Sequence, residues 1–218
     1  MLKNIQGLKY PDEHLVRFFF KEKLNQITGS VLELGCGNGN NLMLFAEYNW
    51  NIMGVDINNK LIGAANFNFK HLNKNNFRFK TNDMVKFIKK YNGEKFDCFL
   101  LPNSLYYLSE EKIIELLKLI QDKKILKRKC FVYFSIRLND DYRLKKAKKI
   151  NNKTYKFNFT ETGELNCINT FFEEKEFINL LKKYFTFSHI RKIKVNFENF
   201  QNNLIVGNSC LIVWGRLK

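Results

Sequence analysis

The sequence predicts an α/β fold built on a doubly wound, mostly parallel sheet with helices on both faces. Two observations predict this class. Short apolar runs alternate with segments of helical periodicity from residue 31 onward. The first apolar run also leads through a glycine-rich turn directly into a helical pattern. A strand, a tight loop and a helix in this order are typical of a nucleotide-binding βα unit.

Length and charge limit the possible functions. The 218 residues are long enough for one domain with a substantial core, and no repeat or linker divides them. We therefore expect a single domain over residues 1–218. The formal net charge is +16, which suits a nucleic acid, an anionic membrane surface or a small anionic substrate. The lysines are dispersed, which favours a small anionic substrate or solubility alone.

The cysteines and histidines argue against a disulfide framework or a metal site. The five cysteines are odd in number and none shows C-x-x-C spacing, so we expect reduced thiols in a cytoplasmic protein. The three histidines are far apart in the sequence, and no metal is expected. We expect neither a signal peptide nor a membrane-spanning segment.

The glycine-rich turn follows the apolar run that begins at Val31. Gly35, Gly37 and Gly39 let the backbone bend sharply and let a ligand approach it closely. The third glycine comes two places after the second, whereas a dinucleotide fingerprint places it three places after. Glu33 precedes the first glycine by two residues and completes an E-x-G-x-G-x-G pattern.

An acidic residue ends the second predicted strand, residues 51–56. In nucleotide-binding α/β folds a carboxylate at this place accepts hydrogen bonds from the ribose hydroxyls, and the sequence distance from Gly35 to Asp56 fits such a unit. The alternative is that Asp56 caps the following helix, because Asn58 and Asn59 come next. We favour the ribose role, and we include Ile57 in the same site.

The stretch from Glu33 to Gly39 resembles motif I of the class I S-adenosylmethionine-dependent methyltransferases. The resemblance implies a sheet of seven strands with an antiparallel C-terminal strand, supplied by segments near 187–197 and 209–215, with a polar connection over 197–207. It implies S-adenosylmethionine as the cofactor. It also implies that Glu33 meets the amino group of this donor or the nearby loop backbone.

Two further segments match the family by position. Asp83 and Met84 follow the third strand, residues 77–81, where the family contacts the adenine; an equal alternative is that Asp83 only caps the next helix. Asn103 follows the fourth strand, residues 96–101, where the methionine end of the donor passes. Leu101-Pro102-Asn103-Ser104 departs from the Asn-Pro-Pro-Tyr signature of many DNA, RNA and protein amine methyltransferases and is closer to small-molecule enzymes.

Two segments are expected to cover the site. The first is an N-terminal helical cover, residues 1–29, in which Tyr10, His14 and Arg17 close the pocket and Arg17 meets the donor carboxylate. The second is an insertion, residues 136–170, with a hairpin formed by 155–159 and 165–169. After it, Thr170-Phe171-Phe172-Glu173 predicts a capping box that opens a helix. His14 and Tyr106 are the candidate catalytic bases, although a lone His or Tyr is more often structural.

These features predict a methyltransferase that modifies an oxygen or nitrogen of a small, anionic metabolite. Tyr10-Pro11-Asp12-Glu13-His14 resembles small bacterial methyltransferases that act on sugars or surface-glycan precursors. The alternative is an RNA methyltransferase, which the net charge and the lysines of 145–153 favour. An alternative of another class is a non-catalytic protein that binds S-adenosylmethionine or a partner. The loop spacing argues against a nicotinamide dehydrogenase.

Overall fold

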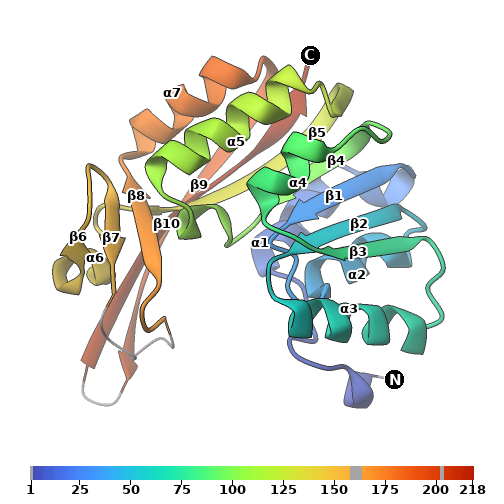
Figure 1. Cartoon of the computed structure of the whole chain (residues 1–218), viewed down its shortest axis with the longest axis horizontal. Coiled ribbons are helices and arrows are strands. Elements are labelled where there is room, and N and C mark those ends of the chain that lie inside the picture. The colour runs from blue at the N-terminus through green and yellow to red at the C-terminus, as the bar shows by residue number, and fades with distance from the viewer. Residues whose placement is uncertain (1, 158–163, 202–203) are drawn as a thin grey trace.

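A mostly parallel sheet organises the computed structural model, which describes residues 2–157, 164–201 and 204–218. Its seven main strands follow the order β3-β2-β1-β4-β5-β10-β9 (Figure 1). Strands β1 to β5 pair in parallel, and β10 runs antiparallel to both β5 and β9. The predicted doubly wound sheet with an antiparallel C-terminal strand is confirmed. The order reverses between β1 and β4, which is where such sheets bind ligands.

The elements have the following bounds. The main strands are β1 (Ser30–Leu34), β2 (Asn51–Asp56), β3 (Phe77–Thr81), β4 (Phe96–Leu101), β5 (Leu126–Leu138), β9 (Phe187–Gln201) and β10 (Leu204–Leu217). The α-helices are α1 (Glu13–Lys21), α2 (Asn40–Glu47), α3 (Asn59–His71), α4 (Met84–Lys90), α5 (Glu110–Asp122), α6 (Tyr142–Lys146) and α7 (Glu174–Tyr184). Three short 3-10 helices are η1 (Leu2–Asn4), η2 (Leu24–Gln26) and η3 (Leu105–Tyr107).

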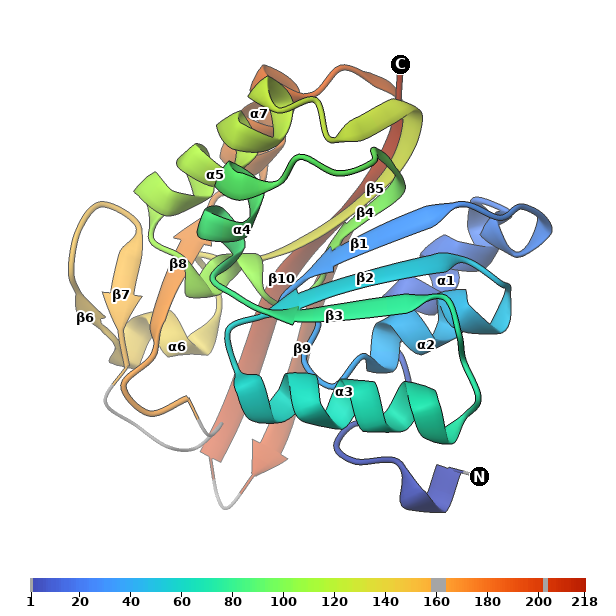
Figure 2. The same cartoon turned by 45° about the vertical axis from the view of Figure 1, so that its right-hand side comes forward.

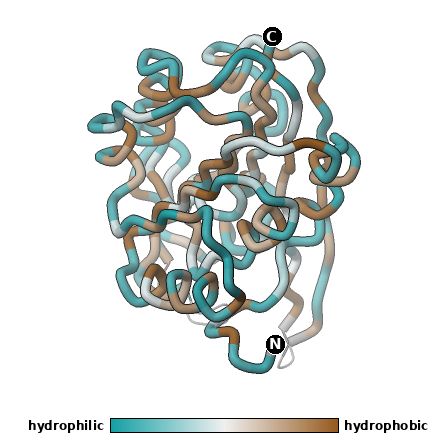
Figure 3. Tube along the Cα trace, turned by 90° about the vertical axis from the view of Figure 1, so that its right-hand side faces the viewer, coloured by the Kyte–Doolittle hydropathy of each residue, from teal (hydrophilic) through white to brown (hydrophobic). Residues whose placement is uncertain are grey.

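Helices cover both faces of the sheet. Figure 1 shows α4, α5 and α7 on one face and α1, α2 and α3 on the other, and a separate apolar core lies under each set. Helix α5 illustrates the cause: Ser109 caps it, and Ile113, Leu116, Leu117 and Ile120 share its buried side. Hydrophobic and hydrophilic segments alternate along the chain accordingly (Figure 3). Among the described residues, no helix combines the length and apolarity needed to cross a membrane.

The predicted insertion forms a small sheet beyond the end of β5. Strands β6 (Lys148–Lys149), β7 (Thr154–Lys156) and β8 (Ile168–Phe172) pair antiparallel in turn. Strand β8 also pairs in parallel with the last residues of β5, so this sheet extends from the main one (Figure 2). The hairpin is confirmed by the pairing of β7 with β8, while residues 158–163 of its predicted outer part lie outside the described residues.

Two boundaries were predicted wrongly. The helix after the insertion does not begin with Thr170, because residues 170–172 belong to β8, where Phe171 pairs with Arg137 of β5. The capping box of α7 is instead made by Glu173 and Glu176. The polar connection predicted over 197–207 is also wrong: its described residues belong to β9 and β10, which pair there, with Phe197 opposite Asn208. In both places long-range pairing overrides a local signal.

Asp97 joins the N-terminal ends of β1, β4 and β5, which generates a stability prediction. Its carboxylate accepts hydrogen bonds from the Ser30 backbone N–H at 2.9 Å and from Lys127 Nζ at 2.8 Å. Burial raises the pKa of Asp97, but the bonds from Lys127 and Ser30 outweigh this effect and hold the pKa below its ordinary value of 3.8. The charged form is thus favoured in the folded state.

Asp97→Asn should lower the free energy of unfolding by about 1 kcal/mol at neutral pH. Because the folded pKa is depressed, this contribution is present above the unfolded pKa and is lost as the pH falls through the folded one. The difference in the free energy of unfolding between the wild type and Asp97→Asn should therefore shrink below about pH 4. Urea unfolding across this range measures it, with Asp122→Asn on the exposed side of α5 as control. An advantage that is constant with pH would contradict the role given to the charge.

Candidate functional site

The glycine loop, residues 35–39, turns the chain sharply at the end of β1. Gly35, Gly37 and Gly39 all have positive φ angles, of 79°, 53° and 79°, which glycine adopts without strain. The N–H of Gly35 donates to the Val55 carbonyl at 2.7 Å and so folds the loop against the end of β2. A Cβ at Gly35 would lie 2.3 Å from the Cβ of Ser104. Gly35 therefore lets the segment after β4 pack directly on the loop.

Glu33 is a buried carboxylate with one unused oxygen. Its side chain is on β1, and the residue is only 1% exposed. Oε1 accepts a hydrogen bond from Asn41 Nδ2 at 2.8 Å, whereas Oε2 has no partner among the described residues. Burial raises the pKa of Glu33 to about 8, an effect that the Asn41 bond reduces and the carboxylates of Asp56 and Asp12 increase. A positively charged ligand group at Oε2 would stabilise the ionised form.

Asp56 connects the loop to the start of α3. Its Oδ2 accepts from the Gly37 N–H at 2.9 Å, and its Oδ1 accepts from the Asn58 N–H at 2.8 Å. The cap of α3 is Asn58, which accepts from the N–H groups of Lys60 and Leu61, so Asp56 is not the helix cap. A carboxylate has about four acceptor positions, and two hydrogen bonds leave Asp56 able to accept more.

Asparagines of the loop fasten the N-terminal segment over the site, a role that the sequence reasoning missed. Asn38 Nδ2 donates to the carbonyls of Gln6 and Leu8 at 2.7 and 2.8 Å. Asn40 Nδ2 donates to the Tyr10 carbonyl at 2.9 Å. The signal was present in the sequence, since three asparagines surround Gly39. The segment before α1 is thereby held against the carboxyl edge of the sheet.

Asp12 and Ser135 are two further residues that the sequence reasoning did not assign to the site. Asn103, with a φ of 50°, donates its N–H to Ser135 Oγ at 2.6 Å and its Nδ2 to Asp12 Oδ2 at 3.1 Å. The Asp12 N–H donates to Asn41 Oδ1 at 2.9 Å. A continuous chain of hydrogen bonds thus runs from Glu33 through Asn41 and Asp12 to Asn103.

The other predicted cofactor residues lie at the periphery of this group. Asp83 caps α4 by accepting from the Lys86 N–H at 2.9 Å, and Met84 packs against the core at the start of that helix. The side chains of Tyr10, Arg17 and Ile57 are exposed. The structure therefore brings together Glu33, the loop glycines, Asp56 and Asn103, and it leaves the side chains of Tyr10, Arg17 and Ile57 facing solvent.

The two candidate bases have different surroundings. His14 lies in the first turn of α1, where its backbone N–H donates to Asp12 Oδ1 at 2.9 Å. Tyr106 is buried, with the Arg137 guanidinium 4.2 Å from its ring centre. Burial raises the pKa of Tyr106, which keeps its hydroxyl protonated near neutral pH. The role of catalytic base stays a prediction for both residues. The described residues contain no cluster of His, Cys, Asp and Glu that could hold a metal ion.

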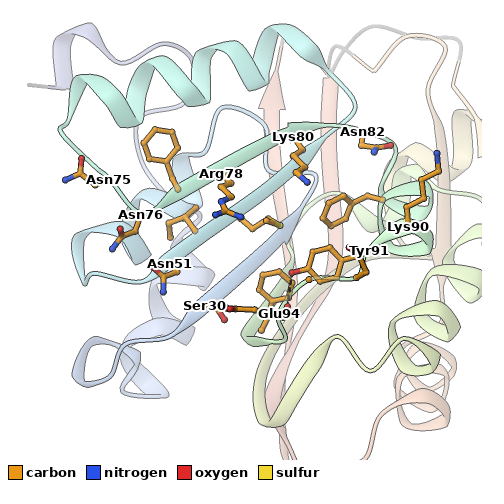
Figure 4. Close-up of a pocket in the computed structure, with 17 residues that line it drawn as sticks. Ser30, Asn51, Asn75, Asn76, Arg78, Lys80, Asn82, Lys90, Tyr91 and Glu94 are labelled. Atoms are coloured by element: carbon orange, nitrogen blue, oxygen red, sulfur yellow. Dashed lines mark hydrogen bonds between the residues drawn. The ribbon is translucent and has the colours of Figure 1, made fainter.

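A large hollow lies elsewhere, on the sheet face that α4 covers only in part. It has a volume of about 700 Å³ and is lined by residues of β1, β2, β3 and the segment from Lys90 to Phe96. Figure 4 shows Arg78, Lys80 and Tyr91 around it. Helix α4 has only seven residues, so the first halves of these strands stay open. Glu33, Asp56 and Asn103 do not line the hollow, so it is distinct from the site described above.

The contact between Gly35 and Ser104 generates a matched test of the loop. Gly35→Ala should destabilise the fold by about 2–4 kcal/mol, because overlap with Ser104 adds to backbone strain. Gly37→Ala should cost only about 1–2 kcal/mol, since its new Cβ would meet nothing within 4 Å. Ser104→Gly also removes the hydrogen bond that Ser104 Oγ donates to the Leu34 carbonyl at 2.7 Å. In urea unfolding it should therefore restore part of the loss in the first variant and lower the stability of the second further. Equal losses without rescue would show that the close approach is unimportant.

Comparisons with known proteins agree with this geometry. The family model described as a methyltransferase domain matches residues 28–184. A solved methyltransferase from Methanosarcina mazei described as S-adenosylmethionine-dependent is 18% identical, with a TM-score of 0.64 over 88% of this chain and 94% of that one. The N-methyltransferase NodS from Bradyrhizobium japonicum, solved with S-adenosylhomocysteine, is 15% identical, with a TM-score of 0.60 over 94% and 86%.

A third solved structure, the 1,6-didemethyltoxoflavin-N1-methyltransferase of Burkholderia thailandensis, is 15% identical, with a TM-score of 0.63 over 94% of this chain and 77% of that one. No curated protein matches the chain. The structural likenesses show the shared Rossmann-like fold, and the family model covers far more than half of the sequence. The chain therefore belongs to the methyltransferase-domain family.

Proposed function

We propose that this chain transfers the methyl group of S-adenosylmethionine to an oxygen or nitrogen of a small, anionic metabolite. One observation carries the choice of donor: the buried carboxylate of Glu33, with Oε2 unpartnered among the described residues, lies beside the glycine loop. An ammonium group is the natural partner for a buried carboxylate. Two of the solved neighbours, NodS and the toxoflavin methyltransferase, were obtained with S-adenosylhomocysteine, which supports the same donor.

The residues fit this donor as follows. Glu33 would accept from its ammonium group, and the glycine loop would approach its backbone closely. Asp56 would accept from the ribose hydroxyls. Asn103 would meet the methionine end, as the family resemblance implies. The adenine would lie against Ile57, Asp83 and Met84, and Tyr10 and Arg17 would close over the site from the N-terminal cover.

The chain's own contribution to the reaction is orientation. When bound, the donor supplies an electrophilic methyl group on its sulfonium. The protein must hold the acceptor in line with it and exclude water, which is a matter of proximity and orientation. The network of Asp12, Asn103 and Ser135 gives this region fixed hydrogen-bonding positions. His14 would accept the proton of an acceptor that does not lose it readily.

The acceptor would enter between the N-terminal cover, residues 1–29, and the insertion, residues 136–170, as two parts of one domain over 1–218. The exposed Lys145, Lys148 and Lys149 of the insertion would attract anions to this edge. A sugar or surface-glycan precursor with an anionic group is one such class. The same lysines favour the second candidate, an RNA methyltransferase, since exposed cations also bind phosphate backbones.

The first test concerns Asp56. Asp56→Asn keeps two acceptor lone pairs but removes the charge, and it should weaken S-adenosylhomocysteine binding by about 1.5–3 kcal/mol. Calorimetric titration measures this change. Asp122→Asn serves as the control, because it removes the same single negative charge elsewhere on the protein. A dissociation constant equal to that of the wild type, in a variant with a normal melting temperature, would remove Asp56 from the ribose site.

The second test separates the two candidate functions. Methyl transfer from labelled donor is measured to total cellular RNA and, separately, to a mixture of nucleotide sugars and phosphorylated metabolites. We expect the label to appear in the metabolites. Strong labelling of RNA at physiological salt would instead establish an RNA methyltransferase, provided that it depends on the lysines of the insertion. The labelling should then be lost when Lys145, Lys148 and Lys149 are changed to Ala. It should be kept when the control residues Lys112, Lys175 and Lys182 are changed to Ala.

A further inference from the structure

A buried group of charged side chains lies between the end of β5 and the insertion. Arg137 at the end of β5, Asp141 and Arg143 at the start of α6, and Glu164 before β8 are each at most 8% exposed. Burying charges is costly unless they are paired and hydrogen-bonded. This group lies at the carboxyl edge of the sheet, where α/β folds bind ligands. Its charges therefore have two possible roles, which are to hold the insertion in place and to bind part of a ligand.

The Glu164 carboxylate is held by side chains from three separate elements. Its Oε1 lies 2.7 Å from Arg137 Nη2 and accepts from the Tyr107 hydroxyl at 2.7 Å. Its Oε2 accepts from Arg143 Nε at 2.7 Å. Both oxygens are therefore bound, each by a charged donor. Short, charge-assisted contacts of this kind are typical of specific carboxylate recognition.

The two arginines are also held by groups other than Glu164. Arg137 donates to Asn169 Oδ1 and its guanidinium lies over the Tyr106 ring. Arg143 has a carboxylate of its own in Asp141, at 3.1 Å, and donates to Asn208 Oδ1 at 2.9 Å. Two guanidinium groups face two carboxylates. Among the described residues, removal of Glu164 would leave one positive charge uncompensated, in donors that other contacts keep in place.

The position of Arg137 connects this group to the methyl-transfer region. Tyr133, Ser135 and Arg137 alternate along β5 and so share one face of the strand. The Tyr133 hydroxyl donates to Asp12 Oδ1 at 3.4 Å, and Ser135 bonds Asn103. Arg137 is the next residue in this row, roughly 7 Å further along the strand. A small molecule at Asn103 could reach the guanidinium with its far end.

We propose that Arg137, Arg143 and Tyr107 form the carboxylate-binding part of the acceptor site and that Glu164 occupies it until a carboxylate-bearing acceptor replaces it. This inference rests on the proposed function and adds the class of acceptor, a carboxylic acid. Exchange of one carboxylate for another leaves the charge balance of the buried group unchanged, so neither state holds an unpaired guanidinium. Glu164 is thus an internal competitor of the acceptor.

The test uses benzoate as the probe and benzamide as its neutral counterpart, both titrated calorimetrically into protein saturated with S-adenosylhomocysteine. The wild type should bind benzoate weakly and benzamide not at all. Glu164→Ala should bind benzoate roughly tenfold more tightly or better, because the competitor is gone. Glu115→Ala, on the exposed side of α5, is the control of equal charge and should match the wild type. Glu164→Ala combined with Arg137→Met should lose the gain.

A second readout separates competition from a purely structural role. In the wild type, benzoate should increase hydrogen exchange at the amides of Glu164 to Cys167, because the displaced carboxylate releases them. If benzoate binds Glu164→Ala but not the wild type, Glu164 is a fixed structural carboxylate and the proposal fails. The proposal also fails if Glu164→Ala gains no affinity for benzoate. If Glu164→Ala does not fold, Glu164→Gln takes its place in this test. S-Adenosylhomocysteine binding, measured separately, reports on the donor site alone.

Discussion

The burial of Glu33 at the end of β1 is the constraint around which the site is arranged. A carboxylate that is 1% exposed needs polar neighbours, and Asn41 supplies one hydrogen bond. The loop that leaves Glu33 must bend at once, so that Asn41 can return to it from the first turn of α2. Glycine at position 35 permits this bend and at the same time admits Ser104 from the segment after β4. One buried carboxyl group thus brings two strand ends together.

The N-terminal segment depends on the same group. Asn41 contacts Glu33 through one end of its amide and the Asp12 backbone through the other. Asp12 then caps α1, and its carboxylate accepts hydrogen bonds from Asn103 Nδ2 and from the Tyr133 hydroxyl. A change at Glu33 would therefore alter both the charge of the site and the position of the segment that closes over it. This explains why the loop is rich in asparagine, whose amide both donates and accepts.

Features with a local cause could be predicted from the sequence, and features that depend on distant pairing could not. Asp12 and Ser109 each cap the helix that follows, a local feature that depends only on the next few residues. The start predicted for α7 failed because Phe171 pairs with β5. The link between Asp12 and Asn103 joins residues 91 positions apart, and Glu164 meets Arg137 only after the insertion folds. No periodicity or spacing signals such contacts.

The most direct measurement is the binding of S-adenosylhomocysteine to the wild type and to Glu33→Gln, with NAD as the competing nucleotide. Glu33→Gln keeps the shape of the side chain and a carbonyl for the Asn41 bond, but it removes the negative charge offered to the ammonium group. We expect micromolar binding to the wild type, a loss of roughly tenfold or more in the variant, and no binding of NAD. Equal affinity in both proteins, or binding of NAD alone, would contradict it.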